Sequence, residues 1–192
     1  MHRAPVRGDG LHASDPRTDQ ELVEAANRGD TAAFEALYLR YRDWTVRLAY
    51  RFAGNADDAL DVLQDTFAYL LKKFPGFELT ARMTTFLYPA VKHLALARRR
   101  RRHDPIPDDE HPEAMAVPPA QPDATSRAEL AAVLANLSAG QREVLLMRVV
   151  DGLSLDEIAQ ALAIPVGTVK SRLHNALESL RADPRAQRYF EA

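Results

Sequence analysis

The sequence predicts an all-α protein of two small helical domains joined by a flexible linker. Apolar residues recur at spacings of three and four over most of the chain, which is the period of an amphipathic helix. No segment alternates polar and apolar residues with a period of two, so we expect no sheet. Six of the twelve prolines fall in one acidic stretch that cannot form a core, and this stretch divides the chain.

The 192 residues are therefore expected to fall into consecutive parts with different roles. The two folded parts are linked and flanked by polar segments that lack apolar periodicity. The expected parts are a disordered tail (1–18), a front domain (19–103), an acidic, proline-rich linker (104–125), a back domain (126–183) and a C-terminal tail (184–192).

Composition excludes several kinds of site. The chain has no cysteine, which excludes disulfides, thiolate zinc sites and cysteine nucleophiles. The six histidines lack metal-ligand spacing and there is no glycine-rich phosphate loop, so we expect no catalytic site, no metal, no cofactor and no enzyme. No apolar run approaches the roughly 20 residues of a membrane span, and residues 1–16 contain no signal-peptide core. We therefore expect a cytoplasmic protein without membrane insertion.

Three helices are expected in the front domain. Asp30 is expected to cap the first, which Gly54 ends, and its apolar stripe consists of Phe34, Leu37, Tyr38, Tyr41, Trp44, Leu48 and Phe52. Asn55 is expected to cap the second, which Pro75-Gly76 stops, and its stripe consists of Leu60, Leu63, Phe67, Leu70, Leu71 and Phe74.

The third helix should start near Thr84 or Thr85 and run into the arginines 98–102. If Thr85 is its N-cap, Pro89 removes a hydrogen bond and kinks the first turn. Residues 82–103 contain seven basic and no acidic residues, whereas 104–129 contain one basic and seven acidic residues. The formal charge of −2 is thus the sum of segregated blocks, and it does not argue against a nucleic-acid partner.

Four helices are expected in the back domain, over about 126–136, 139–150, 155–162 and 166–182. Ser138 with Gln141, and Ser154 with Glu157, fit the capping box. Gly152 stands where a helix end needs a left-handed residue.

Residues 153–173 have the spacing of a helix-turn-helix. Ile158 and Ala159 would form the inner face of its first helix, and residues 163–165 the turn. The second helix would fit the DNA major groove, and its outward face would carry hydrogen-bond donors and positive charge. The residues of this face are Thr168, Lys170, Ser171, Arg172, His174 and Asn175. An ordinary helical hairpin with a polar face is the alternative at this point.

These segments resemble a known family. Residues 141–148, 152–159 and 164–174 resemble region four of bacterial sigma factors, and more narrowly of the extracytoplasmic-function (group 4) sigma factors of the sigma-70 family. The acidic helix 57–67 and the stretch 86–97 with its arginines resemble region two of that group. The resemblance covers about residues 19–183, in the family's order.

The resemblance implies a function for each surface. Region four would read the −35 element as duplex through the six outward residues named above. The acidic helix would dock on the coiled coil of the large subunit of the RNA polymerase core through Asp57, Asp58, Asp61, Gln64 and Asp65. The basic block would bind and melt the −10 element of promoter DNA through Phe86, Tyr88, Lys92, His93, Arg98 and Arg99. An anti-sigma factor is a further implied partner, and the acidic linker, with Asp108, Asp109, Glu110 and Glu113, would mimic nucleic acid in the polymerase.

Two other functions remain open from the sequence. A free-standing helix-turn-helix regulator would need neither the acidic helix nor aromatic residues beside the arginines. A sigma-like adaptor without promoter activity is favoured by Phe86, Pro89 and His93, which depart from the family's usual residues.

Overall fold

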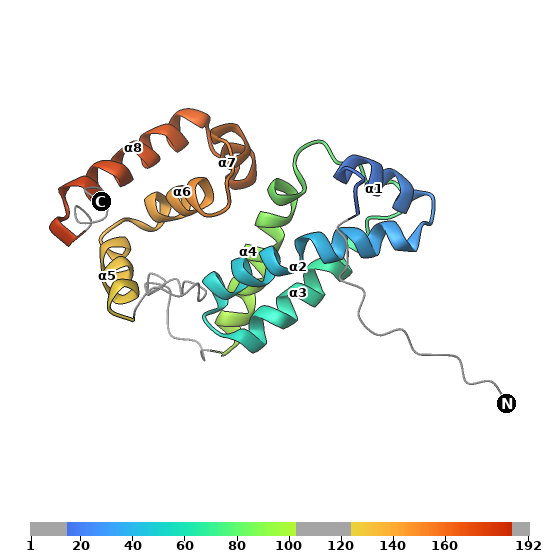
Figure 1. Cartoon of the computed structure of the whole chain (residues 1–192), viewed down its shortest axis with the longest axis horizontal. Helices are drawn as coiled ribbons and strands as arrows, with labels where there is room; N and C mark the ends of the chain where they lie inside the picture. Colours follow the sequence, from blue (N-terminus) through green and yellow to red (C-terminus); the bar gives the residue numbers. More distant parts are fainter. Residues whose placement is uncertain (1–14, 103–123, 186–192) are drawn as a thin grey trace.

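The computed structural model describes residues 15–102 and 124–185, and every regular element in those ranges is a helix. The front group consists of α1 (Asp19–Asn27), α2 (Thr31–Ala53), α3 (Ala56–Leu71) and α4 (Met83–Arg102). The back group consists of α5 (Ala124–Ala135), α6 (Ala139–Val149), α7 (Leu155–Leu162) and α8 (Val166–Ala182). Figure 1 shows the groups beside each other, with α7 near the start of α4. The predicted all-α fold is confirmed.

Local capping residues fix the ends of the front helices as expected. The Asp30 carboxylate accepts hydrogen bonds from the backbone N–H groups of Ala32 and Ala33 at 3.0 and 3.2 Å. Asn55 caps α3, and Gly54 ends α2 in the left-handed region at φ 82°. These contacts satisfy backbone groups that a helix end leaves without partners.

Helix α4 starts at Met83, one to two residues before the expected start. Its first backbone hydrogen bonds run to the Arg82 carbonyl, from the N–H groups of Thr85 and Phe86. Thr85 is therefore inside the helix and is not its N-cap. Pro89 lies in the second turn on the exposed side, where its ring faces away from the core.

Helix α1 was not predicted. It begins with a capping box in which Thr18 and Glu21 satisfy each other's backbone N–H groups. Residues 15–18, expected in the tail, are held in place: the Arg40 guanidinium donates to the carbonyl oxygens of Asp15 and Arg17 at 2.8 and 2.7 Å. Residues 1–14, residues 103–123, which include most of the predicted linker (104–125), and the end of the C-terminal tail (186–192) lie outside the described residues.

The front group has its own core between α1, α2, α3 and the start of α4. Leu22, Leu37 and Leu70 are fully buried there, and Phe67 meets Phe34 edge to face. A smaller core in the back group joins α5, α6 and α8 around Leu137 and Leu145. Each group therefore buries an apolar face of its own, which is the driving force expected for a small helical domain.

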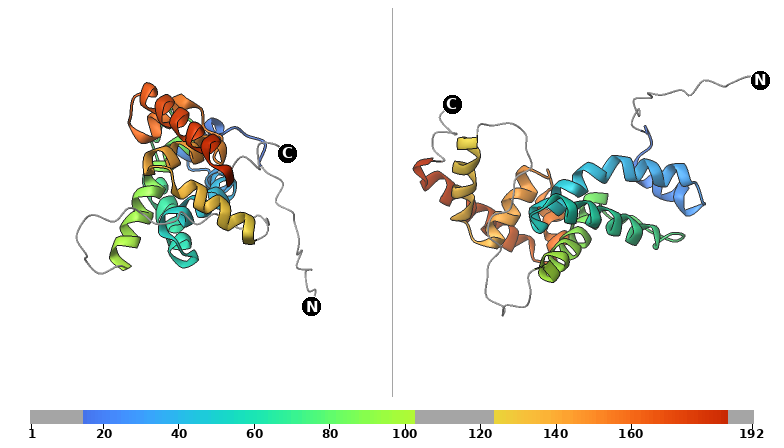
Figure 2. Two further views of the ribbon diagram at one scale, coloured as in Figure 1. Left: turned by 90° about the vertical axis from the view of Figure 1, so that its left-hand side faces the viewer. Right: turned by 90° about the horizontal axis from the view of Figure 1, so that it is seen from below.

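A further buried cluster crosses from one group to the other. It contains Phe52 and Tyr88 from the front group and Val144, Met147 and Val169 from the back group. The turned views in Figure 2 show the back group packed against the front group. The two groups, expected to be separate domains, are thus in contact through buried side chains.

Candidate nucleic-acid interface

Helices α7 and α8 form the predicted helix-turn-helix. Ser154 and Glu157 make the expected capping box at the start of α7. Ala163 ends the helix in the left-handed region at φ 52°, and the N–H of Ile164 bonds the Ala159 carbonyl at 3.1 Å. This tight turn brings α8 back across α7, where Ala159 and Val169 are buried.

One face of α8 is polar and exposed. Lys170, Ser171, His174 and Asn175 are exposed, and Thr168 is half-buried. The Ser171 hydroxyl donates to the Thr168 carbonyl at 3.0 Å, within the first turns of the helix. A helix with cationic and amide side chains on one open face can enter a major groove and contact base edges.

Arg172 differs from its expected orientation. Its side chain is half-buried, and its guanidinium lies over Gly140 near the start of α6, where an added Cβ would be 3.1 Å away. The side chain therefore packs against α6 and does not point outward with its neighbours. The absence of a side chain at Gly140 gives the guanidinium its space.

The acidic residues of α3 form a ridge that faces the arginines of α4. Arg98 donates to Asp61 at 2.5 Å and to Asp65 at 2.7 Å, and Arg102 donates to Asp58 at 3.3 Å. The hydrogen bond to Asp65 raises the pKa of Arg98 further above its usual range. The structure thus brings together two groups of residues that the sequence assigned to different partners.

The remaining ridge residues, Asp57 and Gln64, are exposed. They keep the acidic surface of α3 open to a partner, since no ion pair of the described residues involves Asp57. The α3 ridge, defined as Asp57, Asp58, Asp61, Gln64 and Asp65, is therefore partly neutralised and partly available.

The predicted aromatic and basic surface of α4 is only partly accessible. His93 is exposed, as base contact requires, whereas Phe86 is half-buried against the front core, with its ring centroid 4.7 Å from that of Phe77. Tyr88 is only 1% exposed, which contradicts its expected role as an open stacking surface. Burial and the nearby Glu143 charge raise the pKa of the Tyr88 hydroxyl, which donates to Glu143 at 2.9 Å.

Lys92 and Arg98 of α4 are also engaged. Lys92 is half-buried and donates to Glu143 at 2.6 Å, and its ammonium lies 5.8 Å from the centre of the Phe52 ring. Arg98 bonds the α3 ridge as described, and Arg99 is half-buried. Lys92 and Arg98 would have to leave these carboxylates before they could bind phosphate.

Sequence reasoning missed Tyr69 of α3. Its exposed ring is nearly parallel to that of Phe86, with centroids 6.3 Å apart, and the Lys73 ammonium lies 4.9 Å from its centre. An aromatic face beside a cation is a common way to bind an unstacked base and its phosphate. The signal was present, because Tyr69 falls off the apolar stripe of α3 and precedes Lys73 by four residues.

No group of three or more histidine, cysteine, aspartate or glutamate side chains is arranged to hold a metal within 15–102 and 124–185. Over the same ranges, no helix is both long and apolar enough to span a bilayer.

Comparisons with known proteins match both halves of the chain. The family model described as "Sigma-70 region 2" matches residues 37–104, and the one described as "Sigma-70, region 4" matches residues 127–180. The ECF RNA polymerase sigma factor SigW of Bacillus subtilis is 30% identical over 84% of this chain and 94% of its own length. The RNA polymerase sigma-H factor of Pseudomonas aeruginosa is 34% identical over 84% of this chain and 91% of its own length.

Two solved structures share the fold. The structure of CnrH in complex with the cytosolic domain of CnrY matches 85% of this chain and 95% of that chain, with a TM-score of 0.64 and 24% identity. The sigma factor RpoE of Bartonella quintana, solved with the anti-sigma factor NepR, matches 77% of this chain and 94% of that chain, with a TM-score of 0.57 and 22% identity.

Proposed function

The chain belongs to the sigma-70 family as an extracytoplasmic-function sigma factor that directs promoter-specific initiation of transcription, and we propose how its surfaces divide that work. The main observation in support of this function is that the chain contains both sigma regions in the family's order. In addition, helix α8 of the helix-turn-helix has an exposed polar face. The free-standing regulator is set aside, because it does not account for region 2.

We propose that α8 reads the −35 duplex. Lys170 and His174 supply positive charge or donors for phosphate, and Asn175 has the amide geometry that pairs with adenine. Thr168 and Ser171 add hydroxyl groups near the helix N-terminus, which favours a phosphate. Arg172 joins this face after its guanidinium moves off Gly140.

We propose that the α3 ridge docks on the basic coiled coil of the large polymerase subunit. Five carboxylate or amide side chains on one helix face complement a basic surface. Because Arg98 and Arg102 already bond three of them, docking exchanges an internal ion pair for an external one.

We propose that α4 captures the −10 element once the duplex opens. His93 is exposed and Phe86 is partly exposed, with the exposed Tyr69 ring beside Phe86, so these residues are the first candidates for contact with unstacked bases. Lys92, Arg98 and Arg99 are further proposed contacts to phosphate, whereas Tyr88 is buried in the cluster shared with the back group and is not proposed as a base contact. Flipping a base costs a few kcal/mol, which stacking and phosphate contacts repay. We therefore propose that the energy of binding the unpaired strand opens the DNA. In this proposal the chain is not an enzyme.

The proposed division of the chain is a region 2 domain over 19–103, a linker over 104–125 and a region 4 domain over 126–183, between the segments 1–18 and 184–192. The structure extends the first domain to include residues 15–18, which contact Arg40 and cap α1, and begins α5 at Ala124. Its proposed place of action is the cytoplasm, where polymerase and promoter DNA are found. An anti-sigma factor is a further proposed partner, supported by the similar sigma factor RpoE solved with one.

Run-off transcription with purified core polymerase on a promoter library tests the function. We expect transcripts that begin at a small set of promoters only when the chain is present. Tight core binding without any defined start would support the adaptor function in its place. A variant with Lys170, His174 and Asn175 all replaced by alanine should bind core normally and lose selection of the −35 element.

A further inference from the structure

The turn between α3 and α4 is held by one side chain from a helix that is distant in sequence. Residues 72–82 form neither helix nor strand, and within the described residues no backbone–backbone hydrogen bond involves 75–81. Asn27, the last residue of α1, bonds this backbone instead. Its Oδ1 accepts from the N–H groups of Gly76 and Phe77 at 2.7 and 3.1 Å, and its Nδ2 donates to the Phe77 carbonyl oxygen at 2.9 Å. In the part of the chain that the structure describes, these are the only hydrogen bonds to the backbone of 75–81.

Asn27 is itself fixed in place by the packing of α1. The preceding residues Leu22, Val23 and Ala25 are buried in the core of the front group. After Asn27 the chain turns into α2 through Gly29, whose φ of 91° lies in the left-handed region. Figure 1 shows α1 beside the turn that joins α3 to α4. The Asn27 amide therefore ties this turn to a packed part of the front group.

The turn carries an aromatic side chain that supports the Phe86 ring. Phe77 is buried, and its ring centroid lies 4.7 Å from that of Phe86 and 5.6 Å from that of Phe74. The Phe86 ring in turn lies nearly parallel to the exposed Tyr69 ring. Because Asn27 bonds both backbone polar groups of Phe77, it sets the position of the ring against which Phe86 rests.

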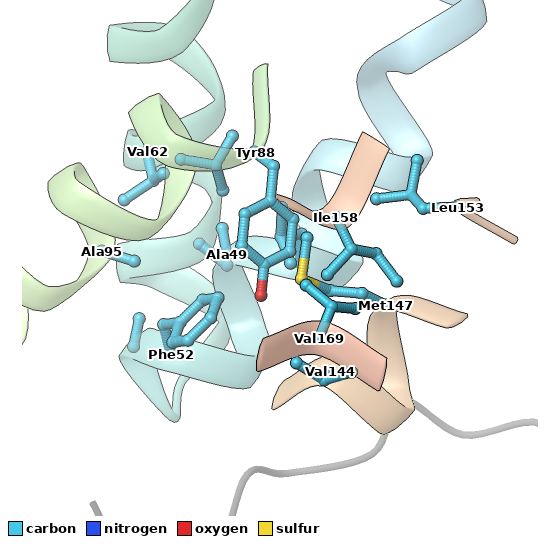
Figure 3. Close-up of a cluster of buried hydrophobic side chains, with 14 of the residues drawn as sticks. Ala49, Phe52, Val62, Tyr88, Ala95, Val144, Met147, Leu153, Ile158 and Val169 are labelled. Carbon is cyan, nitrogen blue, oxygen red and sulfur yellow. The ribbon is translucent and has the colours of Figure 1, made fainter. Parts of the chain in front are cut away.

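Phe86 is the aromatic ring of α4 that stays open beside this turn. Tyr88 lies about 200° further around the helix. In Figure 3 its ring extends toward Val144 and Val169 of the back group, within a buried cluster. Phe86 packs instead on the front core and is partly exposed next to Tyr69. A ring that is held before a base arrives loses less entropy on binding than one that must first be ordered.

We propose that Asn27 is a positioning residue for capture of the −10 strand by Phe86. Its three hydrogen bonds fix the turn at Gly76 and Phe77, and the Phe77 ring then holds Phe86 in the orientation that receives an unpaired base. Asn27 itself contacts no DNA in this proposal, which rests on the proposed function of Phe86. Without the bonds the turn samples several backbone conformations, and only the fraction that supports Phe86 binds the strand tightly.

Replacement of Asn27 by alanine in the full chain removes all three bonds. The chain is bound to core polymerase, and the probe is a fluorescent single strand with the −10 sequence of a promoter that the complex transcribes. Fluorescence anisotropy gives the Kd of this strand. We expect Asn27→Ala to weaken strand binding about tenfold, because apparent affinity falls with the fraction of molecules in the competent conformation. Binding of the −35 duplex depends on α8 and should stay the same.

Two further variants change the turn in a graded way. Asn27→Asp keeps an acceptor for the two N–H groups and loses only the donor to the Phe77 carbonyl, so it should recover most of the strand affinity. Gly76→Ala leaves α1 intact but strains the turn, because Gly76 has a φ of 104° that residues with a Cβ rarely adopt. It should weaken strand binding as Asn27→Ala does, which keeps the test decisive even if Asn27→Ala lowers the helix content.

Thr18→Ala is the matched control for a loss of stability in α1. The Thr18 hydroxyl caps the other end of this helix and, among the described residues, hydrogen-bonds only Glu21. In this control, hydrogen exchange of the Gly76 and Phe77 amides should match that of the unchanged chain, and so should strand affinity. Both should change in Asn27→Ala, where the two amides lose their acceptor.

The outcomes separate the role of Asn27 from the proposed function. Unchanged strand affinity in Asn27→Ala or, if that variant unfolds, in Gly76→Ala would overturn the positioning role. An equal loss in Asn27→Ala and Thr18→Ala would overturn it too, because the loss would then come from the stability of α1. Both results leave the proposed function standing when Phe86→Ala weakens strand binding. Full strand affinity in Phe86→Ala would instead refute the proposed function of Phe86, and the role of Asn27 would fall with it.

Discussion

Replacement of Arg98 by alanine separates a structural role from a DNA-binding role for the α4 arginines. In the structure its guanidinium bridges Asp61 and Asp65 of the α3 ridge at 2.5 and 2.7 Å. The three side chains are 30%, 50% and 45% exposed, so solvent screens the pairs. Exposed pairs of this kind contribute about 0.2–1 kcal/mol each.

Arg98→Ala should therefore lower the free energy of unfolding by about 1 kcal/mol, which corresponds to a melting temperature lower by about 2–4 °C. The same loss releases two carboxylates for docking. We expect binding to core polymerase to become up to about fivefold tighter, the equivalent of about 1 kcal/mol.

Fluorescence anisotropy of labelled chain titrated with core polymerase measures this effect. The gain should disappear near 1 M salt, where the Debye length falls to about 3 Å. Arg47→Ala, at an exposed arginine of α2, is the matched control for loss of a positive charge. Unchanged core binding together with weaker −10 DNA binding would refute the ion-pair reasoning and favour direct phosphate contact by Arg98.

Three further outcomes are expected. Lys170→Ala should weaken −35 duplex binding and reduce the slope of log affinity against log salt by about 1, because one phosphate contact is lost; an unchanged slope in a salt titration would exclude that contact. Burial raises the pKa of Glu157, but hydrogen bonds from Ser154 and the Arg82 charge outweigh it and hold the pKa below its usual value. The stability that the Glu157 carboxylate contributes to the cap is therefore complete above about pH 4.5 and is lost as the pH falls below that value. Ser154→Ala should lower the stability by about 1 kcal/mol and make the melting temperature depend less on pH in the acid range. An unchanged pH dependence in that range would contradict this role of the cap. Asp19→Asn should weaken the 2.6 Å ion pair that holds α1 to Arg40, and hydrogen exchange should then speed up in α1 alone; equal protection in both proteins would remove Asp19 from that role.

Much of the fold could be predicted because helix ends are set locally. Asp30, Asn55 and Ser154 act within three residues of themselves, so their capping roles can be read from short stretches of sequence. The limits of α7 and α8 match the expected ranges for the same reason. Helix α1 has the same kind of signal in Thr18, but its apolar stripe is too short for periodicity to predict the helix.

Contacts between distant helices could not be predicted in this way. Periodicity shows which face of a helix is apolar, but not which helix will cover that face. Glu143 lies 51 and 55 residues from its partners Lys92 and Tyr88, and no local pattern links them. For the same reason, Tyr88 was expected to be an open aromatic, and Arg172 was expected to point away from the protein.

The site residues form two classes in physical terms. Lys170, His174 and Asn175 lie on an exposed helix face whose orientation follows from periodicity, and the structure places them as expected. The contacts of Tyr88 and Lys92 run to Glu143 of the back group. Their burial therefore depends on contacts across 55 and 51 residues of sequence, which local periodicity does not predict.

The most direct test of the central claim is permanganate reactivity of promoter thymines, which reports unpaired bases. With core polymerase and this chain together, we expect reactivity confined to the −10 region of a promoter selected by run-off transcription, and none with core alone. Phe86→Ala should suppress that reactivity while duplex binding at −35 persists. A promoter that is bound by the complex but remains unreactive at −10 would contradict the account of this chain as an initiation factor.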